Sequence, residues 1–440
     1  MKKTLVALAA LTAIAASAQT STNKPGFEIN GLFNAGYQAN SYKGVNVKGI
    51  DQNGSGTTQI NFRGLEDLGG GMSAYFRVEN DLSIMNNAAN TGIIPAYSAS
   101  TAAALTPGGN STVQKTTYGV AGTFANSEIL VGLRSPVGDV AFGQIHNAGL
   151  TMIQGTVSPL AGTAFGGGYG TIIGADPTMT TTRWANSFRY ITPTINGVTA
   201  QYIKAFKQDS ASVPVSATSG VAITTTSLGV GLNNQVGADE LGIKYSNGPL
   251  NVAYVASKTS FASFCAAPSS THYLTNTDAT VNPCYSTGAL TTGSAISTAQ
   301  DNKQNSLAAN YNLGNGFLVA GAMQKTTLGN VGSTTGNQSD RSAQMFTVQY
   351  TSGANTVFAT TGSVKENSSI NNRNGQKSTF TGIGYNYALS KTTALVARYE
   401  SLDDQAKVLD LTATTAYSSL QSTDSSTKRT RSMLGLHMAF

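Results

Sequence analysis

The residues that could perform acid–base or nucleophilic chemistry are few in this sequence and lie far apart. His146, His272 and His437 are its three histidines, and none has Asp or Glu at a spacing that suggests a catalytic pair. Hydrolytic catalysis needs a base within hydrogen-bond reach of a nucleophile or an acid. We therefore expect no catalytic residues, and an enzyme with acid–base pairs at its rim stays an alternative.

Neither a phosphate-binding loop nor a metal site is indicated. The segment GGGYG at 166–170 resembles a phosphate loop, but it lacks the following Lys-Ser/Thr and the strand-to-helix setting. The sequence shows no zinc-ligand spacing and no basic run suited to nucleic acid. We expect no cofactor, no metal and no nucleic-acid partner.

The charged residues alternate with apolar ones instead of gathering at one site. In MSAYFRVENDL, residues 72–82, Arg77, Glu79 and Asp81 alternate with Phe76 and Val78. Successive side chains of a β-strand point to opposite faces of its sheet. One face of this segment is thus apolar, while the other is charged.

The composition argues against an ordinary globular enzyme. Only 11% of the residues are charged, against a usual share of about 25%. The chain has 48 glycines, and 40% of its residues are hydrophobic. No stretch after the first twenty residues is apolar for the ~18 residues that a membrane-spanning helix needs. A secreted repeat protein, a β-rich adhesin and a membrane barrel are compatible with this composition.

The first residues predict export. MKK is a short basic start, LVALAALTAIAA is apolar, and Ala16-Ser17-Ala18 fits the small-x-small rule of signal peptidase. We expect residues 1–18 to be a cleaved signal peptide, with a membrane-anchoring helix as the alternative. Residues 1–18 contain Lys2 and Lys3 and no Asp or Glu, so their loss takes the formal charge from +6 to +4.

Two cysteines, Cys265 and Cys284, lie in one polar stretch rich in Ser and Thr. Disulfides persist in proteins exported to oxidising compartments. We expect a disulfide between them.

Segments of about ten residues with weak alternation recur along the chain. We expect about sixteen strands, near residues 27–39, 57–66, 72–83, 127–134, 139–146, 183–192, 197–206, 238–247, 250–259, 303–313, 316–326, 341–351, 354–364, 377–389, 392–402 and 428–440. Short turns such as SPVGD alternate with long segments near 84–126, 147–182, 207–237, 260–302 and 403–427. Short turns on one side and long loops on the other are typical of a bacterial outer-membrane barrel.

Energetics favour closure of the sheet in a membrane. Inside hydrocarbon every backbone N–H and C=O must pair internally, so a sheet must join its own edges. A soluble β-sandwich would alternate in the same way, but its apolar face would need a partner sheet. Arg77, Glu79 and Arg189 lie in strand interiors, where a wet lumen accommodates them without desolvation. The sequence therefore predicts an all-β protein: a transmembrane antiparallel β-barrel over residues 19–440, with short periplasmic turns and long external loops.

The last strand supports this interpretation. In RSMLGLHMAF, residues 431–440, one parity carries Leu434, Leu436, Met438 and Phe440. We expect this face to contact lipid, with Phe440 in the aromatic girdle at the periplasmic interface.

These segments resemble the general porins of β-proteobacteria, of the Neisseria and Burkholderia type. The resemblance rests on FEINGLFNAGY, INFRGLEDLGGGMSAYFRVEN, VGLRSPVGDVAFGQ and LGLHMAF, and it covers most of the chain except the long loops. The LEDLGGG block combined with the terminal phenylalanine is its most specific part.

The resemblance implies a sixteen-stranded barrel in the outer membrane of a Gram-negative bacterium, surrounded by lipid and lipopolysaccharide, and assembled as a homotrimer. It also implies that the third loop folds into the lumen and narrows the pore. That loop corresponds to residues 147–182, whose only acidic residue is Asp176.

Selection in such a channel comes from its width and from fixed charges on its wall. By parity, the expected pore-lining residues are Arg63, Arg77, Glu79, Asp81, Arg183, Arg189, Arg429 and Arg431. Of these, Arg77 is expected nearest to mid-barrel and is the first candidate for the constriction.

The chain departs from the family's pattern of basic residues. Gln59, Gln144, Ser127 and Glu128 stand where relatives often carry basic residues, while Arg63 is retained. We therefore expect passive diffusion of small hydrophilic solutes and ions with a weak anion preference. A substrate-specific channel and a plugged structural or adhesive barrel stay open as alternatives.

Overall fold

The computed structural model describes residues 25–42, 45–52, 56–82, 127–157, 183–206, 236–261, 301–328, 339–367, 375–403, 405 and 428–440. The expected signal peptide at 1–18, Asp176, and the expected disulfide between Cys265 and Cys284 lie outside these residues.

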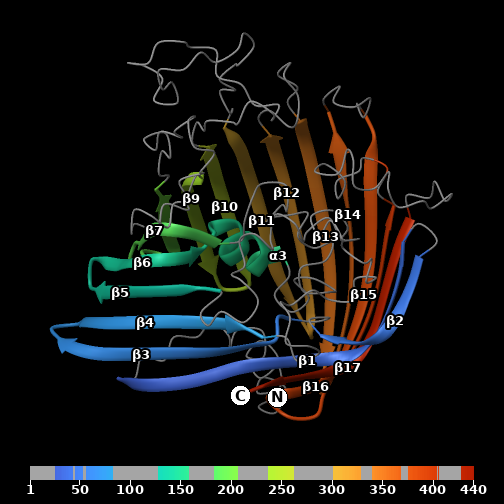
Figure 1. Cartoon of the computed structure of the whole chain (residues 1–440), viewed down its shortest axis with the longest axis horizontal. Coiled ribbons are helices and arrows are strands. Elements are labelled where there is room, and N and C mark those ends of the chain that lie inside the picture. The colour runs from blue at the N-terminus through green and yellow to red at the C-terminus, as the bar shows by residue number, and fades with distance from the viewer. Residues whose placement is uncertain are drawn as a thin grey trace, which may run out of the picture.

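Nearly all described residues lie in one antiparallel sheet (Figure 1). Its strands are β1 Gly26–Tyr42, β2 Val45–Gln52, β3 Gln59–Gly69, β4 Met72–Asp81, β5 Ile129–Ser135, β6 Gly138–His146, β7 Arg183–Ile191, β8 Val198–Ala205, β9 Val236–Asn247, β10 Leu250–Phe261, β11 Asn302–Gly314, β12 Phe317–Leu328, β13 Ser339–Ser352, β14 Asn355–Glu366, β15 Lys377–Ala388, β16 Thr393–Asp403 and β17 Lys428–Ala439.

The sheet closes on itself because β1 pairs along both of its edges. One edge pairs with β17, from Leu32↔Ala439 to Tyr42↔Arg429. The other edge pairs with β3 over Gly26–Leu32 and with β2 over Ala35–Tyr42. Since β2 and β3 share one edge of β1, the seventeen strands occupy sixteen positions in the wall. The prediction of a closed, sixteen-stranded antiparallel barrel is confirmed.

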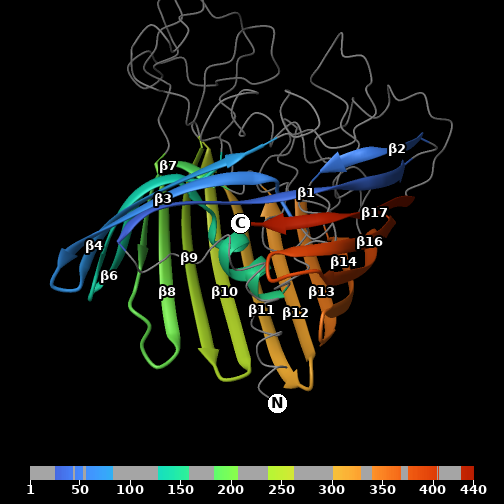
Figure 2. The same ribbon diagram turned by 90° about the horizontal axis from the view of Figure 1, so that it is seen from below.

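The two views of the molecule show the tilt of this wall. The strands β1–β4 on one side cross the direction of β9–β13 on the other side (Figures 1 and 2). Opposite walls of a barrel cross in this way because each strand is inclined to the barrel axis, typically by about 35–45°.

The two faces of the wall have the polarity of a membrane barrel. Outward-facing large apolar side chains are exposed on every strand except β7, such as Phe142, Leu307, Phe346 and Ile383. Inward-facing positions bury polar groups instead, such as Asn61, which is fully buried. A water-soluble sheet buries its apolar face. Here the apolar face is the exposed one.

Short turns join the strands at one end of the barrel. The turn between β7 and β8 places Asn196 and Gly197 at φ 50° and 82°. This left-handed region is open to glycine and tolerated by asparagine, so the Asn-Gly pair allows the chain to reverse within a few residues.

The terminal phenylalanine lies at the seam. The backbone of Phe440 exchanges two hydrogen bonds with Gly31, of 3.1 and 3.2 Å. Its ring stacks on Phe33, with the ring centres 5.8 Å apart. A Cβ at position 31 would lie 2.7 Å from the Phe440 ring, so the glycine makes room for this contact.

The described start of the third long loop turns into the barrel. After Asn147 the chain forms a short π-helix, η1 Gly149–Gln154, followed by α3 Gly155–Val157. Both helices contact the inner wall at β10 and β11 (Figures 1 and 2). The sequence analysis did not predict these two helices. Residues 158–182 lie outside the described residues.

Small side chains on the inner wall admit this helix. Ala253, Ala308 and Ala320 lie on the lumen side of β10–β12 and pack with Met152 and Ile153. The side-chain amide of Asn310 donates a 2.7 Å hydrogen bond to the carbonyl of Thr156. Among the described residues, no helix is long and apolar enough to cross a membrane.

Phe346 and Gln349 lie on opposite faces of β13 and provide a matched test of the two faces. Phe346→Lys is expected to destabilise the folded barrel in lipid vesicles by about 2–4 kcal/mol, because the lysine then faces hydrocarbon. Gln349→Lys adds the same charge to the wet side, where we expect a clearly smaller loss. Urea titration of both variants in vesicles measures this difference, and equal losses would contradict the assignment of the faces.

Candidate functional site

The densest group of buried charges lies where the inward loop leaves the wall. Arg77 and Glu79 come from β4, Glu128 immediately precedes β5, and His146 ends β6. We call these four residues the root cluster, since the loop begins at the next residue, Asn147. The strand alternation of β4 directs Arg77 and Glu79 to the same face.

Arg77 holds the two carboxylates of the root cluster together. Its Nη1 lies 2.8 Å from Oε2 of Glu128, and its Nη2 pairs with Oε1 of Glu79. Both carboxylates are at least 98% buried. Burying two carboxylates this deeply without a cation would cost several kcal/mol of folding free energy. The ion pairs with the guanidinium of Arg77 therefore stabilise the cluster.

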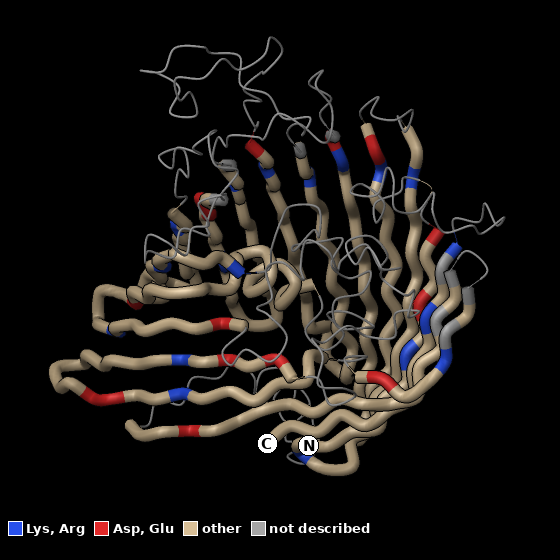
Figure 3. Tube along the Cα trace, viewed as in Figure 1, with Lys and Arg blue, Asp and Glu red and all other residues tan. Residues whose placement is uncertain are grey.

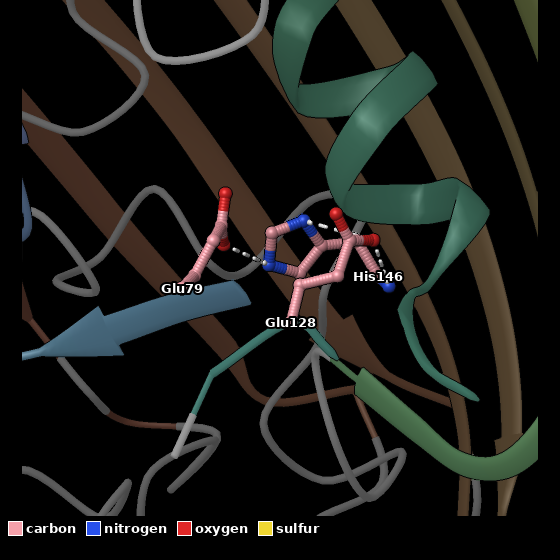
Figure 4. Close-up of side chains that lie close together, drawn as sticks. All are labelled: Glu79, Glu128 and His146. Carbon is pink, nitrogen blue, oxygen red and sulfur yellow. Dashed lines mark hydrogen bonds and ion pairs between the residues drawn. The ribbon is translucent and has the colours of Figure 1, made fainter. Parts of the chain in front are cut away.

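The imidazole of His146 lies between the same two carboxylates (Figure 4). Its Nε2 is 3.3 Å from Oε2 of Glu79, and its Nδ1 is 3.6 Å from Oε1 of Glu128. The backbone N–H of His146 donates a 2.9 Å hydrogen bond to the same oxygen of Glu128. The hydroxyl of Ser127 donates to Oε2 of Glu79 at 3.2 Å.

Further charges extend the root cluster along the inner wall. Arg63 lies directly opposite Arg77 in the pairing of β3 with β4. Arg183 forms a 3.2 Å ion pair with Asp81. Arg189 donates a 3.4 Å hydrogen bond to the hydroxyl of Tyr75. Charged side chains therefore lie on the inner face of β3, β4 and β7, and the root cluster joins them.

The inward loop is attached to the wall by a buried carboxylate, Glu240 of β9. Its Oε2 accepts a 2.7 Å hydrogen bond from the backbone N–H of Ala148, and its Oε1 accepts a 2.8 Å bond from the hydroxyl of Ser257. The backbone of the loop is thereby fixed where it enters the lumen.

The structure brings together most of the residues that parity predicts for the lumen. Arg63, Arg77, Glu79, Asp81, Arg183 and Arg189 lie in the group just described, and Arg431 pairs with Glu400 at 3.2 Å on β17 and β16. Arg429 lies in β17, but its side chain is outside the described residues. The effect of these residues on ion passage stays a prediction.

Sequence reasoning missed Glu128 and His146 as members of the site. The register of β5 and β6 offered a signal, because pairing extends from the turn at 136–137 to Ile129↔Gln144. One further step along this ladder brings Glu128 beside the end of β6. The partnership with Glu79 had no such signal, since residues 83–126 separate β4 from β5.

Comparison with known proteins assigns the family. The model of the Gram-negative porin family matches residues 4–407. The chain belongs to the Gram-negative porin family. Proteins of this family lie in the outer membrane, and we assign the chain to that location.

Individual relatives agree with this assignment. An outer membrane porin protein of Bordetella pertussis is 28% identical over 274 residues, which are 58% of each chain. The chain thus matches somewhat over half the length of this curated relative. The anion-selective porin of Comamonas acidovorans has a similar structure, with a TM-score of 0.58 and 16% identity over 95% of this chain and 100% of that one. The trimer form of OmpT from Vibrio cholerae has a TM-score of 0.56 and 11% identity over 94% and 99%. At these identities the two structures show the fold alone.

The root cluster predicts a difference between two arginines. Arg77→Met removes the cation between two buried carboxylates, and we expect a loss of about 3–5 kcal/mol in folding free energy. Arg134→Met removes one side of the more exposed ion pair with Asp139, of 3.1 Å, where we expect about 1 kcal/mol or less. Urea titration in vesicles compares them. A loss for Arg77→Met no larger than that for Arg134→Met would contradict the structural role of Arg77.

Proposed function

We propose that this porin forms a water-filled channel through which small hydrophilic solutes and ions diffuse across the outer membrane. The observation that carries the proposal is the inverted polarity of the wall. Large apolar side chains are exposed on the outside of a closed barrel, and arginines, glutamates and amides line its inside. Figure 3 shows charged residues along the length of several strands.

The channel acts by lowering a solvation barrier, without a chemical step. An ion that enters hydrocarbon loses its hydration at a cost of order 20 kcal/mol. A lumen lined by side chains such as Asn61, Arg63 and Glu79 replaces part of that hydration. The width of the lumen and the fixed charges then select among solutes. Both the family and the fold favour such a channel over an enzyme.

We further propose a weak anion preference. Around the root cluster, the described wall carries four cationic side chains, Arg63, Arg77, Arg183 and Arg189, and the anionic Glu79, Asp81 and Glu128, with Glu28 opposite Arg63. The charges of this group nearly balance. Most of these charges are paired, so the field that a passing ion meets is weak. The similar porin of Comamonas acidovorans is named anion-selective.

A homotrimer is our proposal for the assembly. OmpT of Vibrio cholerae, which shares the fold, is described in a trimer form. The family resemblance seen in the sequence supports the same state. We also propose that residues 1–18 are removed on export, because their pattern is that of a signal peptide.

Lipopolysaccharide is the lipid partner that the outer surface fits. Lys258 and Lys303 lie directly opposite each other near the loop ends of β10 and β11, and Lys365 opposes Lys377 on β14 and β15. All four are exposed on the lipid-facing parity. Like charges directly opposite destabilise a strand pair, and of the four only Lys258 forms an ion pair with a described carboxylate, Asp301 at 2.7 Å. Phosphate groups of lipopolysaccharide would therefore stabilise this surface.

Planar-bilayer recording in a salt gradient tests the function. We expect open steps that scale with salt, with three equal sublevels if the assembly is a trimer. Arg77→Gln is expected to shift the reversal potential toward cation preference, and Glu128→Gln toward anion preference, because each removes one lumen charge. Lys391→Gln removes a charge from the exposed turn before β16 and should leave the potential unchanged.

Each failure has its own meaning. A folded barrel that never conducts would contradict the channel and favour the plugged barrel. Conduction with no shift in either the Arg77 or the Glu128 variant would exclude the root cluster from the ion path. Passage of one solute class alone in liposome swelling would favour a substrate-specific channel.

A further inference from the structure

Three groups of the root cluster are of the kinds that ligate metals. Glu79, Glu128 and His146 each offer one ligand atom, and these atoms lie within 4.8 Å of one another. They come from β4, the residue before β5 and the end of β6. Their separation along the chain hides the combination from a search for sequence motifs.

The imidazole of His146 provides an independent sign of a ligand. His146 is 93% buried, and its Nε2 has no hydrogen-bond partner, although it lies 3.3 Å from Oε2 of Glu79. Buried side-chain polar atoms are nearly always hydrogen-bonded. This nitrogen faces carboxylate oxygens without a well-formed hydrogen bond (Figure 4). Metal-binding histidines have the same arrangement before the metal is bound.

The two carboxylates divide their oxygens between two partners. Oε1 of Glu79 and Oε2 of Glu128 face Arg77. Oε2 of Glu79 and Oε1 of Glu128 face His146. A carboxylate oxygen has two lone pairs. The oxygens on the His146 side can therefore ligate a cation while Arg77 keeps its own ion pairs.

We propose that Glu79, Glu128 and His146 form a binding site for a divalent transition-metal ion of the Zn²⁺ or Co²⁺ class. Imidazole together with carboxylate suits these ions. Mg²⁺ and Ca²⁺ prefer sites built wholly from oxygen, so the histidine discriminates against them.

The neighbouring groups support ligation. The hydroxyl of Ser127 donates to Glu79, and the backbone N–H of His146 donates to Glu128. Such hydrogen bonds orient ligating carboxylates and are a general feature of metal sites. Arg77 pairs with one oxygen of each carboxylate and so fixes the orientation of both side chains.

A bound dication reverses the charge at the root of the inward loop. The two carboxylates and Arg77 together carry one negative charge, and a metal ligates histidine as the neutral imidazole. A divalent ion makes that charge +1. In a conducting channel this change would oppose the passage of cations. The metal site itself does not rest on the proposed function, because binding can be measured in detergent without conduction.

Calorimetric titration of the folded, detergent-solubilised protein with Zn²⁺ tests the site, and Co²⁺ absorption reports its ligands. We expect saturable binding of one Zn²⁺ per chain, and weak or no binding of Mg²⁺. His146→Gln keeps the size of the side chain and should weaken Zn²⁺ binding by about tenfold or more. Glu128→Gln should weaken it as well.

His437→Gln is the matched control. His437 is also buried on the lumen side, on β17, but it is not part of the cluster. Its replacement should leave Zn²⁺ binding unchanged, because His437 is not a ligand of the proposed site. The His146→Gln and His437→Gln variants both retain His272, so any background binding at His272 is the same in the two. Heat-modifiable migration in gels verifies that each variant is folded.

The proposal is overturned if the folded wild-type protein binds no Zn²⁺ at millimolar concentration. It is equally overturned if folded His146→Gln binds Zn²⁺ as tightly as His437→Gln does. Either result would leave the cluster as a network of buried ion pairs that holds the loop.

Discussion

The pairing of every backbone amide inside a layer that offers no water governs this structure. β1 satisfies the condition by pairing with β17 on one edge and with β2 and β3 on the other. The hydrogen bonds between Gly31 and Phe440 complete the seam at the last residue of the chain. An open edge would leave several unpaired groups in hydrocarbon, each costing several kcal/mol. Closure is therefore the condition for every other feature of the wall.

Once the barrel is closed, alternate side chains of each strand face two different environments, lipid on the outside and water on the inside. The outer parity must be apolar, and the inner parity is free to carry charge. Buried charge then requires partners, which the wall supplies in Arg77 with Glu79 and Glu128 and in Arg183 with Asp81. These pairs also hold the residues from which the inward loop starts. The same charges thus stabilise the wall and hold the start of the loop, and we propose that they also set the field in the lumen.

Local patterns predicted the strands well, because alternation and short turns are encoded within each hairpin. The strand expected near 303–313 is β11, Asn302–Gly314. The strand β2 was not predicted, since its eight residues pair only with the second half of β1, Ala35–Tyr42. The helix after Asn147 escaped notice because GLTMIQGTV is rich in glycine, threonine and β-branched residues of low helix propensity. Burial of Met152 and Ile153 on the inner wall compensates for that propensity.

The candidate site was predicted in part for the same reason. Arg77 and Glu79 are two positions apart on one strand, so their common face could be read from the sequence. Glu128 and His146 join them through pairings between strands, and one of these crosses the long segment 83–126. Dispersed residues of this kind become a cluster only when the register of neighbouring strands is known. The spacing of residues along the sequence therefore did not indicate that His146 lies between two carboxylates.

The inverted polarity of the barrel wall is tested most directly by spin labels placed one at a time at positions 343–350 of β13, with the protein in lipid vesicles. Cys265 and Cys284 are first replaced by serine, so that each label occupies a single site. The structure predicts that labels at even-numbered positions collide mainly with oxygen dissolved in lipid, and labels at odd-numbered positions with a water-soluble nickel chelate. Uniform accessibility to either reagent along the strand would contradict the account.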